Sequence, residues 1–330
     1  MDKEPAPAVE EGESYFPISP LMLFPDTHGK FAVYLRQGDE YVLYTRQGEL
    51  FTEEHRKRMH TLGVAEVFVR SGHKERYQRY VMEHMGDFLS GEDVPVHERA
   101  AIFYDTSLGI VRDTFSTRLP REFSRERFKA IENLVLESVR FLSRQDALQA
   151  LGRLITHDYK VYHHSLNVFV FTVAVLAPMD VARETMVNTG VGAMLHDIGK
   201  QRIPREILDR VDKLTPAERE RLNSHPVQGV AMCANLPLSS EVIGPILFHH
   251  ERMDGRGFPT GLSYEEIPLP VRVVSAVNVY ENLITGSPAR QGMTPFQALK
   301  TLSDESKGAF DPDVVKRLIM VLSGAKIVAG

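Results

Sequence analysis

Histidine and acidic side chains that could ligate metal ions gather in the second half of the chain. Seven of the thirteen histidines lie between His157 and His250. Imidazole and carboxylate together suit Zn, Fe, Mn, Ni or Co, and a carboxylate can bridge two ions. The polar landmarks of this region are His164, His196 with Asp197, His225, His249 with His250, and Asn278. Two ions a few ångströms apart are a recurring device for phosphoester hydrolysis.

The adjacent pair His249 and His250 sets a condition on the geometry. Neighbouring side chains on a helix point about 100° apart, so both rings can serve one centre only at a helix edge or end. The alternative is that one ring faces solvent and the other is a hydrogen-bonded core residue. A single histidine on an apolar helix is more often a core residue than a metal ligand. Several histidines on separate predicted helices are less easily explained as core residues, and they favour a shared metal site. Spacing alone indicates a helical two-metal site in a hydrolase, and it names neither metal nor substrate.

Composition excludes other classes of site. The single cysteine, Cys233, excludes a Cys-rich zinc site and an internal disulfide framework. Of the 330 residues, 43% are apolar and 25% are charged, which is typical of a globular protein. The net charge of −5 provides no basic field for a long nucleic acid, so an anionic ligand must be held by a local site.

The chain carries no sequence feature of secretion or membrane insertion. Its N-terminus lacks the basic start and apolar run of a signal peptide. The longest apolar run, over residues 168–179, is too short to cross a bilayer and indicates a buried core helix. We expect a cytoplasmic protein without a membrane span.

Helices must position the candidate ligands, because apolar residues recur at helical spacing from residue 97 onwards. The spacing predicts helices over 97–116, 123–143 and 145–156. TPAE, starting at Thr215, and TPFQ, starting at Thr294, are capping boxes with proline at the first helical position. Asp311 before Pro312 starts another helix by the same logic.

The N-terminal part differs in character and predicts a small α+β domain over 15–95. Thr52 caps a predicted short helix, and another helix is expected over 73–89. Strand-forming residues occur in LMLF (21–24), KFAVYLR (30–36), EYVLYTR (40–46) and AEVFVR (65–70). This domain could sense a signal, dimerise or dock a partner.

We therefore predict a mainly α protein in four parts. An acidic, Pro-rich disordered tail over 1–14 precedes the α+β domain. The turn 90–96 ends that domain, connecting helices occupy 96–145, and an all-helical metal-binding bundle occupies 146–330.

Residues 158–312 resemble the HD-GYP domain, a branch of the HD superfamily of metal-dependent phosphohydrolases. The matching segments occur in the family's order and spacing, and they are HHSLNV, AMLHDIGKQRIPREIL, LTPAERERLNSHPVQG, HHERMDGRGFPTGL, IPLPVRVVSAVNVYENL and FDPDVV. The resemblance implies an HD-type helical bundle with two divalent metal ions, iron or manganese by preference and Zn, Ni or Co as alternatives. It also implies hydrolysis of a cyclic dinucleotide, with cyclic di-GMP as the usual substrate.

The resemblance assigns a role to each candidate residue by motif. The first ion would be held by what we call the first-ion set: His164, His196, Asp197 and Asn278. Asp197 would bridge to the second ion, whose further ligands form the second-ion set: His225, His249 and His250. Lys200 would contact a phosphate, and a water activated between the ions would attack phosphorus. Further expected substrate contacts are Arg256, Phe258 and Arg290.

Several positions depart from the family pattern. Phe258 replaces the tyrosine of Gly-Tyr-Pro, which keeps the ring and loses the hydroxyl. Asn278 replaces a metal-binding aspartate, and Glu281-Asn282 replaces an Asp-Ala pair. The segment 287–290 keeps only the last basic residue of an Arg-Pro-Tyr-Arg-like motif. Lys160 stands where members with a third ion carry glutamate, which indicates at most two ions.

These departures leave two hypotheses from different classes. The first is a cyclic-dinucleotide phosphodiesterase, weakened or retuned. The intact histidines favour it, because a cluster of buried polar side chains has little structural justification unless it has a function. The second is a catalytically eroded HD-GYP fold that acts as a ligand sensor or protein-interaction module, and the neutral Asn278 favours it. A homodimer or a signalling protein partner is open under either hypothesis.

Overall fold

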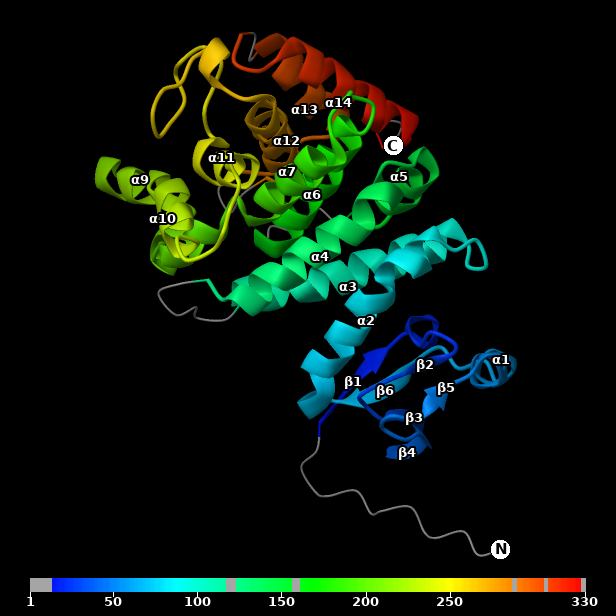
Figure 1. Cartoon of the computed structure of the whole chain (residues 1–330). Helices are drawn as coiled ribbons and strands as arrows, with labels where there is room; N and C mark the ends of the chain where they lie inside the picture. The colour runs from blue at the N-terminus through cyan, green and yellow to red at the C-terminus, as the bar shows by residue number, and fades with distance from the viewer. Residues whose placement is uncertain (1–13, 117–122, 156–160, 287–289, 306–307, 328–330) are drawn as a thin grey trace, which may run out of the picture. The chain divides into compact units, whose positions relative to one another are not determined.

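The computed structural model describes residues 14–116, 123–155, 161–286, 290–305 and 308–327 (Figure 1). The chain divides into two compact units, Met1–Phe88 and Leu89–Gly330. The division falls inside a helix, just before the 90–96 turn in which we expected it. The expected tail over 1–14 lies outside the described residues, apart from Ser14.

The first unit is a small α+β fold built on an antiparallel sheet with the strand order β1-β6-β3-β4. The strands of this sheet are β1 (Tyr15–Ile18), β6 (Val67–Arg70), β3 (Val33–Gln37) and β4 (Glu40–Thr45). The short strands β2 (Thr27–His28) and β5 (Leu50–Phe51) pair separately. The helices are α1 (Glu53–Thr61) and α2 (Lys74–Ser90). The predicted cap is confirmed, since the Thr52 hydroxyl accepts a hydrogen bond from the His55 amide.

The strand expected over Leu21–Phe24 is wrong. Pro20–Met22 form a 3₁₀ helix (η1), in which Pro20 fits the first turn and the Ser19 hydroxyl accepts a hydrogen bond from the Leu21 amide. Met22 and Leu23 are buried nonetheless. A short apolar run is compatible with several structures, and here the local cap selects the turn.

The regular structure among the described residues of the second unit is helical, as predicted, apart from isolated β-bridges such as that between Asp254 and Ser263. Its helices are α3 (Val96–Ser116), α4 (Arg125–Leu142), α5 (Gln145–Gly152), α6 (Val161–Leu176), α7 (Arg183–Leu195), η3 (Ile198–Arg202), α8 (Arg205–Leu208), α9 (Pro216–Asn223), α10 (His225–Met232), α11 (Ser240–Phe248), η4 (Tyr264–Glu266), α12 (Leu269–Thr285), α13 (Pro295–Lys300), the π-helical turn η5 (Thr301–Glu305) and α14 (Pro312–Gly324). The predicted caps at Thr215, Thr294 and Asp311 are confirmed.

Helix α6 forms the centre of the second unit. It is buried from His164 to Leu176 and packs against α3, α7, α12 and α14. Its apolar residues lie on all sides, and such a helix belongs inside a core. Helices α3 and α4, expected as a connecting stretch, also pack on α6 and α7 in this unit. Within the described ranges, no helix has the length and apolar character that a membrane crossing requires.

The candidate ligands are placed mostly at helix ends around α6. His164 lies in the first turn of α6, and His196 with Asp197 directly follows α7. His225 is the first residue of α10. A Cβ on Gly199 would overlap the His225 carbonyl oxygen, so only glycine lets η3 approach α10 this closely.

Candidate metal centre

Asp197 lies between the two sets of histidines and presents one carboxylate oxygen to each. Its Oδ2 is 3.6 Å from His164 Nε2 and 3.4 Å from His196 Nε2. Its Oδ1 is 3.2 Å from His225 Nε2 and 3.7 Å from His249 Nε2. The carboxylate is almost fully buried. This geometry suits a carboxylate that bridges two cations.

Backbone carbonyls fix the tautomer of three histidines. Nδ1 of His196 is 2.6 Å from the Ala193 oxygen, Nδ1 of His225 is 2.8 Å from the Leu222 oxygen, and Nδ1 of His249 is 2.9 Å from the Pro245 oxygen. Because a carbonyl oxygen only accepts, each Nδ1 carries the proton. Each Nε2 is then left with a free lone pair, which is the form that ligates metals.

The free lone pairs point towards one another. Nε2 of His225 and Nε2 of His249 are 3.1 Å apart, and the same distance separates Nε2 of His164 from Nε2 of His196. In the His225–His249 pair both nitrogens are acceptors, and they repel at that distance unless a proton or a cation lies between them. The donor atoms of His164, His196 and Asp197 all lie within 4.8 Å of one another, and so do those of His225, His249 and His250. The residues present therefore fit metal ions in both sets.

His164 is oriented differently, by a carboxylate. Its Nδ1 forms a hydrogen bond with Glu281 Oε2. The other oxygen of Glu281 accepts hydrogen bonds from the Asn167 amide at 3.1 Å and from the Thr285 hydroxyl at 2.8 Å. Glu281 is fully buried. In the sequence, Glu281 is distinguished only as a departure from the family pattern.

Burial and neighbouring charges set the ionisation of the site. Burial lowers the pKa of His249 and His250 well below the usual histidine range, and neighbouring histidines lower it further. Burial raises the pKa of Asp197, but the Lys200 ammonium and His196 outweigh burial and hold it well below its usual value. Burial likewise raises the pKa of Glu281, yet His164 lowers it to about 2. At neutral pH both carboxylates are therefore charged, while His249 and His250 are neutral.

The adjacent histidines meet the geometric condition, because α11 ends at Phe248. The ring centroids of His249 and His250 are 4.2 Å apart, and the His250 ring stacks on Phe258 at 4.4 Å with an interplanar angle of 18°. The His225 ring is 5.1 Å from the His250 ring. Leaving the helix lets both rings turn towards His225.

The loop that carries Phe258 is held by the buried Glu251. The Glu251 carboxylate accepts hydrogen bonds from the backbone amides of residues 260–262 at 2.7–3.1 Å. A Cβ on Gly257 would lie 2.6 Å from the His250 carbonyl oxygen, so glycine is required where this loop passes over the end of α11. Sequence reasoning gave Glu251 no role, although its position after the histidine pair was a signal.

The remaining predicted residues lie at different depths. The Lys200 ammonium is 2.6 Å from Asp197 Oδ2, and 21% of its side chain is exposed. Asn278 is buried, and its Oδ1 accepts a hydrogen bond from the Asn282 amide at 2.8 Å. Arg290 is exposed and donates to the Asn282 carbonyl oxygen at 2.8 Å. Arg256 is exposed as well. Lys160 and residues 287–289 lie outside the described residues.

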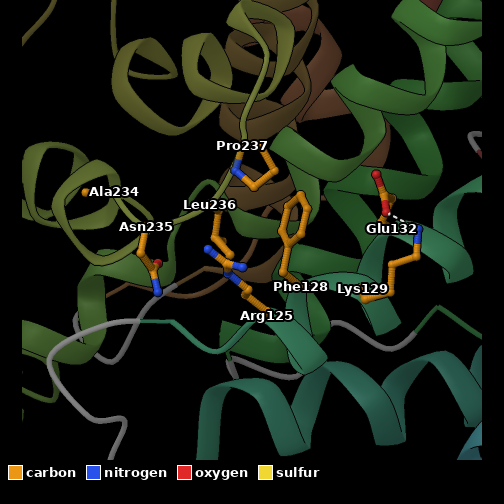
Figure 2. Close-up of a pocket in the computed structure, with 8 residues that line it drawn as sticks. All are labelled: Arg125, Phe128, Lys129, Glu132, Ala234, Asn235, Leu236 and Pro237. Atoms are coloured by element: carbon orange, nitrogen blue, oxygen red, sulfur yellow. Dashed lines mark hydrogen bonds and ion pairs between the residues drawn. The ribbon is translucent and has the colours of Figure 1, made fainter.

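A cavity of about 690 Å³ lies elsewhere in the second unit, between α4 and the loop after α10 (Figure 2). Its lining residues are Arg125, Phe128, Lys129, Glu132, Ala234, Asn235, Leu236 and Pro237. Lys129 is paired with Glu132 at 2.7 Å on this wall. None of the predicted site residues is among those that line it, so the cavity is separate from the metal centre.

Comparison with known proteins identifies a family model and several similar proteins. A family model described as an HD domain matches residues 172–314, a range that begins just after His164. The chain is 33% identical over 183 residues to the cyclic di-GMP phosphodiesterase PA4108 of Pseudomonas aeruginosa, a match that covers 55% of this chain and 44% of that protein. It is 29% identical over 268 residues to a probable cyclic di-GMP phosphodiesterase of Vibrio cholerae, covering 71% of this chain and 60% of that protein.

Two further similarities concern substrate and fold. The chain is 28% identical over 160 residues to the 3'3'-cGAMP-specific phosphodiesterase 3 of Vibrio cholerae, covering 48% of this chain and 35% of that protein. The structure of Bd1817, a HDG"Y"P protein from Bdellovibrio bacteriovorus, matches with a TM-score of 0.63 at 21% identity and covers 94% of this chain and 100% of that chain. HD-domain phosphodiesterases depend on metal ions, and the two sets of donors described above could bind them.

Proposed function

Because the chain belongs to the HD-GYP branch of the HD-domain family, we propose that it hydrolyses a phosphodiester bond of a cyclic dinucleotide with the help of two divalent metal ions. The observation that carries the proposal is Asp197, which turns one oxygen to each set of histidines. A buried carboxylate in that position has little structural purpose without cations on both sides.

The two ions would be divided between the sets. His164, His196 and Asn278 would hold the first ion, His225, His249 and His250 the second, and Asp197 would bridge them. When bound, the ions would lower the pKa of a shared water and polarise a phosphoryl oxygen. Imidazole and carboxylate donors suit Zn, Fe, Mn, Ni or Co alike, and the resemblance to the HD-GYP family favours iron or manganese among them.

Residues at the rim would bind the substrate. The Lys200 ammonium touches Asp197 on one side and is partly exposed on the other, so it can bind a phosphoryl oxygen as negative charge develops there. Phe258 presents a ring beside His250 on which a guanine base could stack. Arg256 and Arg290 are exposed cations that could reach the outer phosphate. Cyclic di-GMP is our first choice of substrate and 3'3'-cGAMP the second, because similar proteins carry those names.

A second candidate function follows from Asn278. Its neutral amide is already engaged by Asn282 and brings no charge to the first-ion set. A chain that bound only the second ion would hold a dinucleotide, or a protein partner, without hydrolysing it. This would make the protein a sensor rather than an enzyme.

The decisive experiment combines metal analysis with turnover. The full chain, purified under reducing conditions, is analysed for bound metal and incubated with cyclic di-GMP and with 3'3'-cGAMP. Asp197→Asn should abolish turnover and lower metal content in both sets. The matched control is Asp311→Asn, which removes another buried carboxylate whose partners are Arg272 and amides of α14. Absence of metal from the unaltered protein would refute the metal-dependent activity.

A further inference from the structure

We infer that Glu281 is a positioning residue for the first metal ion: it holds the His164 ring with Nε2 directed at the first-ion set and makes that ring a more basic ligand. The inference rests on the proposed metal-dependent function and adds to it a residue outside the expected ligands.

Glu281 is fixed from three sides. Oε2 meets His164 Nδ1, while Oε1 accepts from Asn167 at 3.1 Å and from Thr285 at 2.8 Å. Its exposed surface is zero. A buried carboxylate with donors on both oxygens has no freedom to turn, so the ring that it bonds is held in one orientation.

The support for Glu281 extends into a neighbouring helix. The Tyr104 hydroxyl of α3 donates to Asn167 Oδ1 at 3.4 Å. An amide whose oxygen accepts on one side must present its NH₂ group on the other, which is the side of Glu281. The chain of bonds Tyr104–Asn167–Glu281–His164 thus ties α3, α6 and α12 to one ligand.

Glu281 differs from the partners of the other histidines. His196, His225 and His249 each donate Nδ1–H to a neutral backbone carbonyl. A carboxylate partner makes the imidazole a more basic ligand than a carbonyl does. Among the described histidines of the two sets, His164 has the charged partner, and it belongs to the set that lost a carboxylate.

Asn278 and Glu281 occupy neighbouring positions on α12. Residues three apart lie on the same face of a helix, so Asn278 and Glu281 both face α6. The first-ion set has one carboxylate, Asp197, which it shares. Glu281 places a negative charge one ring away from the first ion, farther than a ligating aspartate would place it, so it supports the first-ion set through His164.

Cobalt binding provides the test. Co²⁺ is titrated into the metal-stripped full chain, and the number and affinity of bound ions are followed by visible absorption and elemental analysis. Glu281→Gln keeps the size and removes the charge, and should weaken one of two sites by about 10- to 100-fold. Glu281→Asp keeps the charge and should restore part of the loss. Asp311→Asn should leave both sites unchanged.

A double variant assigns the loss to a site. His225→Ala removes a ligand of the second-ion set alone. If Glu281 serves the first ion, Glu281→Gln combined with His225→Ala loses both tight sites. If the double variant binds Co²⁺ as His225→Ala does, or if Glu281→Gln titrates like the unaltered chain, the inference is wrong. Failure of the unaltered chain to bind Co²⁺ would instead refute the proposed function.

Thr285→Val covers the case in which Glu281→Gln does not fold. It removes one hydrogen bond to Glu281 Oε1 and preserves the shape of the side chain. A fewfold weaker first site, with an unchanged second site, supports the positioning role. An affinity equal to that of the unaltered chain overturns it.

Discussion

Replacing Asn278 with aspartate adds one negative charge to the first-ion set with little change in shape. Asn278 is 2% exposed, and its Oδ1 accepts a hydrogen bond from the Asn282 amide at 2.8 Å. An aspartate oxygen would accept the same bond, so packing on α12 should survive. The expected result is tighter binding of the first ion and faster hydrolysis of cyclic di-GMP.

The magnitude follows from the spacing of the set. The donor atoms of its other three members, His164, His196 and Asp197, lie within 4.8 Å of one another, and a carboxylate that joined them would act on the ion over about 4 Å. At an effective dielectric constant of about 20, a unit charge and a divalent ion then attract by roughly 8 kcal/mol. Desolvation of the carboxylate costs several kcal/mol in return. A net gain of about 1.4–2.8 kcal/mol would tighten binding by roughly 10- to 100-fold.

The assay compares metal per chain and initial rate for Asn278→Asp and the unaltered protein. Asn235→Asp is the matched control, because it adds the same charge in the loop beside α4, away from the histidine sets. The control should change neither quantity. If metal content and rate both stay flat in Asn278→Asp, Asn278 does not face the metal and the reasoning fails.

Four further outcomes are expected. His225→Ala and His249→Ala should each lower metal per chain by elemental analysis while helical circular dichroism is kept; unchanged metal would contradict the second-ion set. Glu251→Gln should lower the free energy of unfolding, measured in urea, by at least about 2 kcal/mol, because three backbone amides lose a charged acceptor. A urea unfolding curve with the same midpoint and slope as that of the unaltered protein would exclude the anchoring role of Glu251. Phe258→Tyr should leave metal content unchanged and lower KM, and a raised KM would argue against base stacking there. A fragment of residues 89–330 should fold and keep its metal, whereas aggregation would show that the first unit completes its core.

Local signals in the sequence were sufficient for the helix caps and for the central buried helix. The capping box at Thr215 involves two residues three positions apart, Thr215 and Glu218. The sequence pattern therefore specifies the hydrogen bonds that form in the structure. The apolar run of α6 was enough to place it in the core. The Leu21–Phe24 strand was wrong because four apolar residues carry no period, so the Ser19 cap decided the local structure.

The site was accessible from the sequence only in part. The motifs identified the histidines and Asp197 because their spacing matches a known family. The partner of His164 could not be found in that way, since Glu281 lies 117 positions further along the chain and meets His164 only when α6 packs on α12. The bond between Asn278 and Asn282 depends on a rotamer, which no sequence pattern specifies.

The position of Glu281 bears on the choice between enzyme and sensor. Both functions require the second ion, so metal content alone does not distinguish them. A sensor that used only the second ion would gain nothing from a buried carboxylate aligned on His164. The unfavourable free energy of desolvating that carboxylate would then be offset by no function. An organised first-ion set is what hydrolysis requires, because the attacking water must be held between two cations. Glu281→Gln should therefore abolish turnover and spare the second ion and dinucleotide binding, whereas full turnover with one ion would remove the reason to assign Glu281 to catalysis.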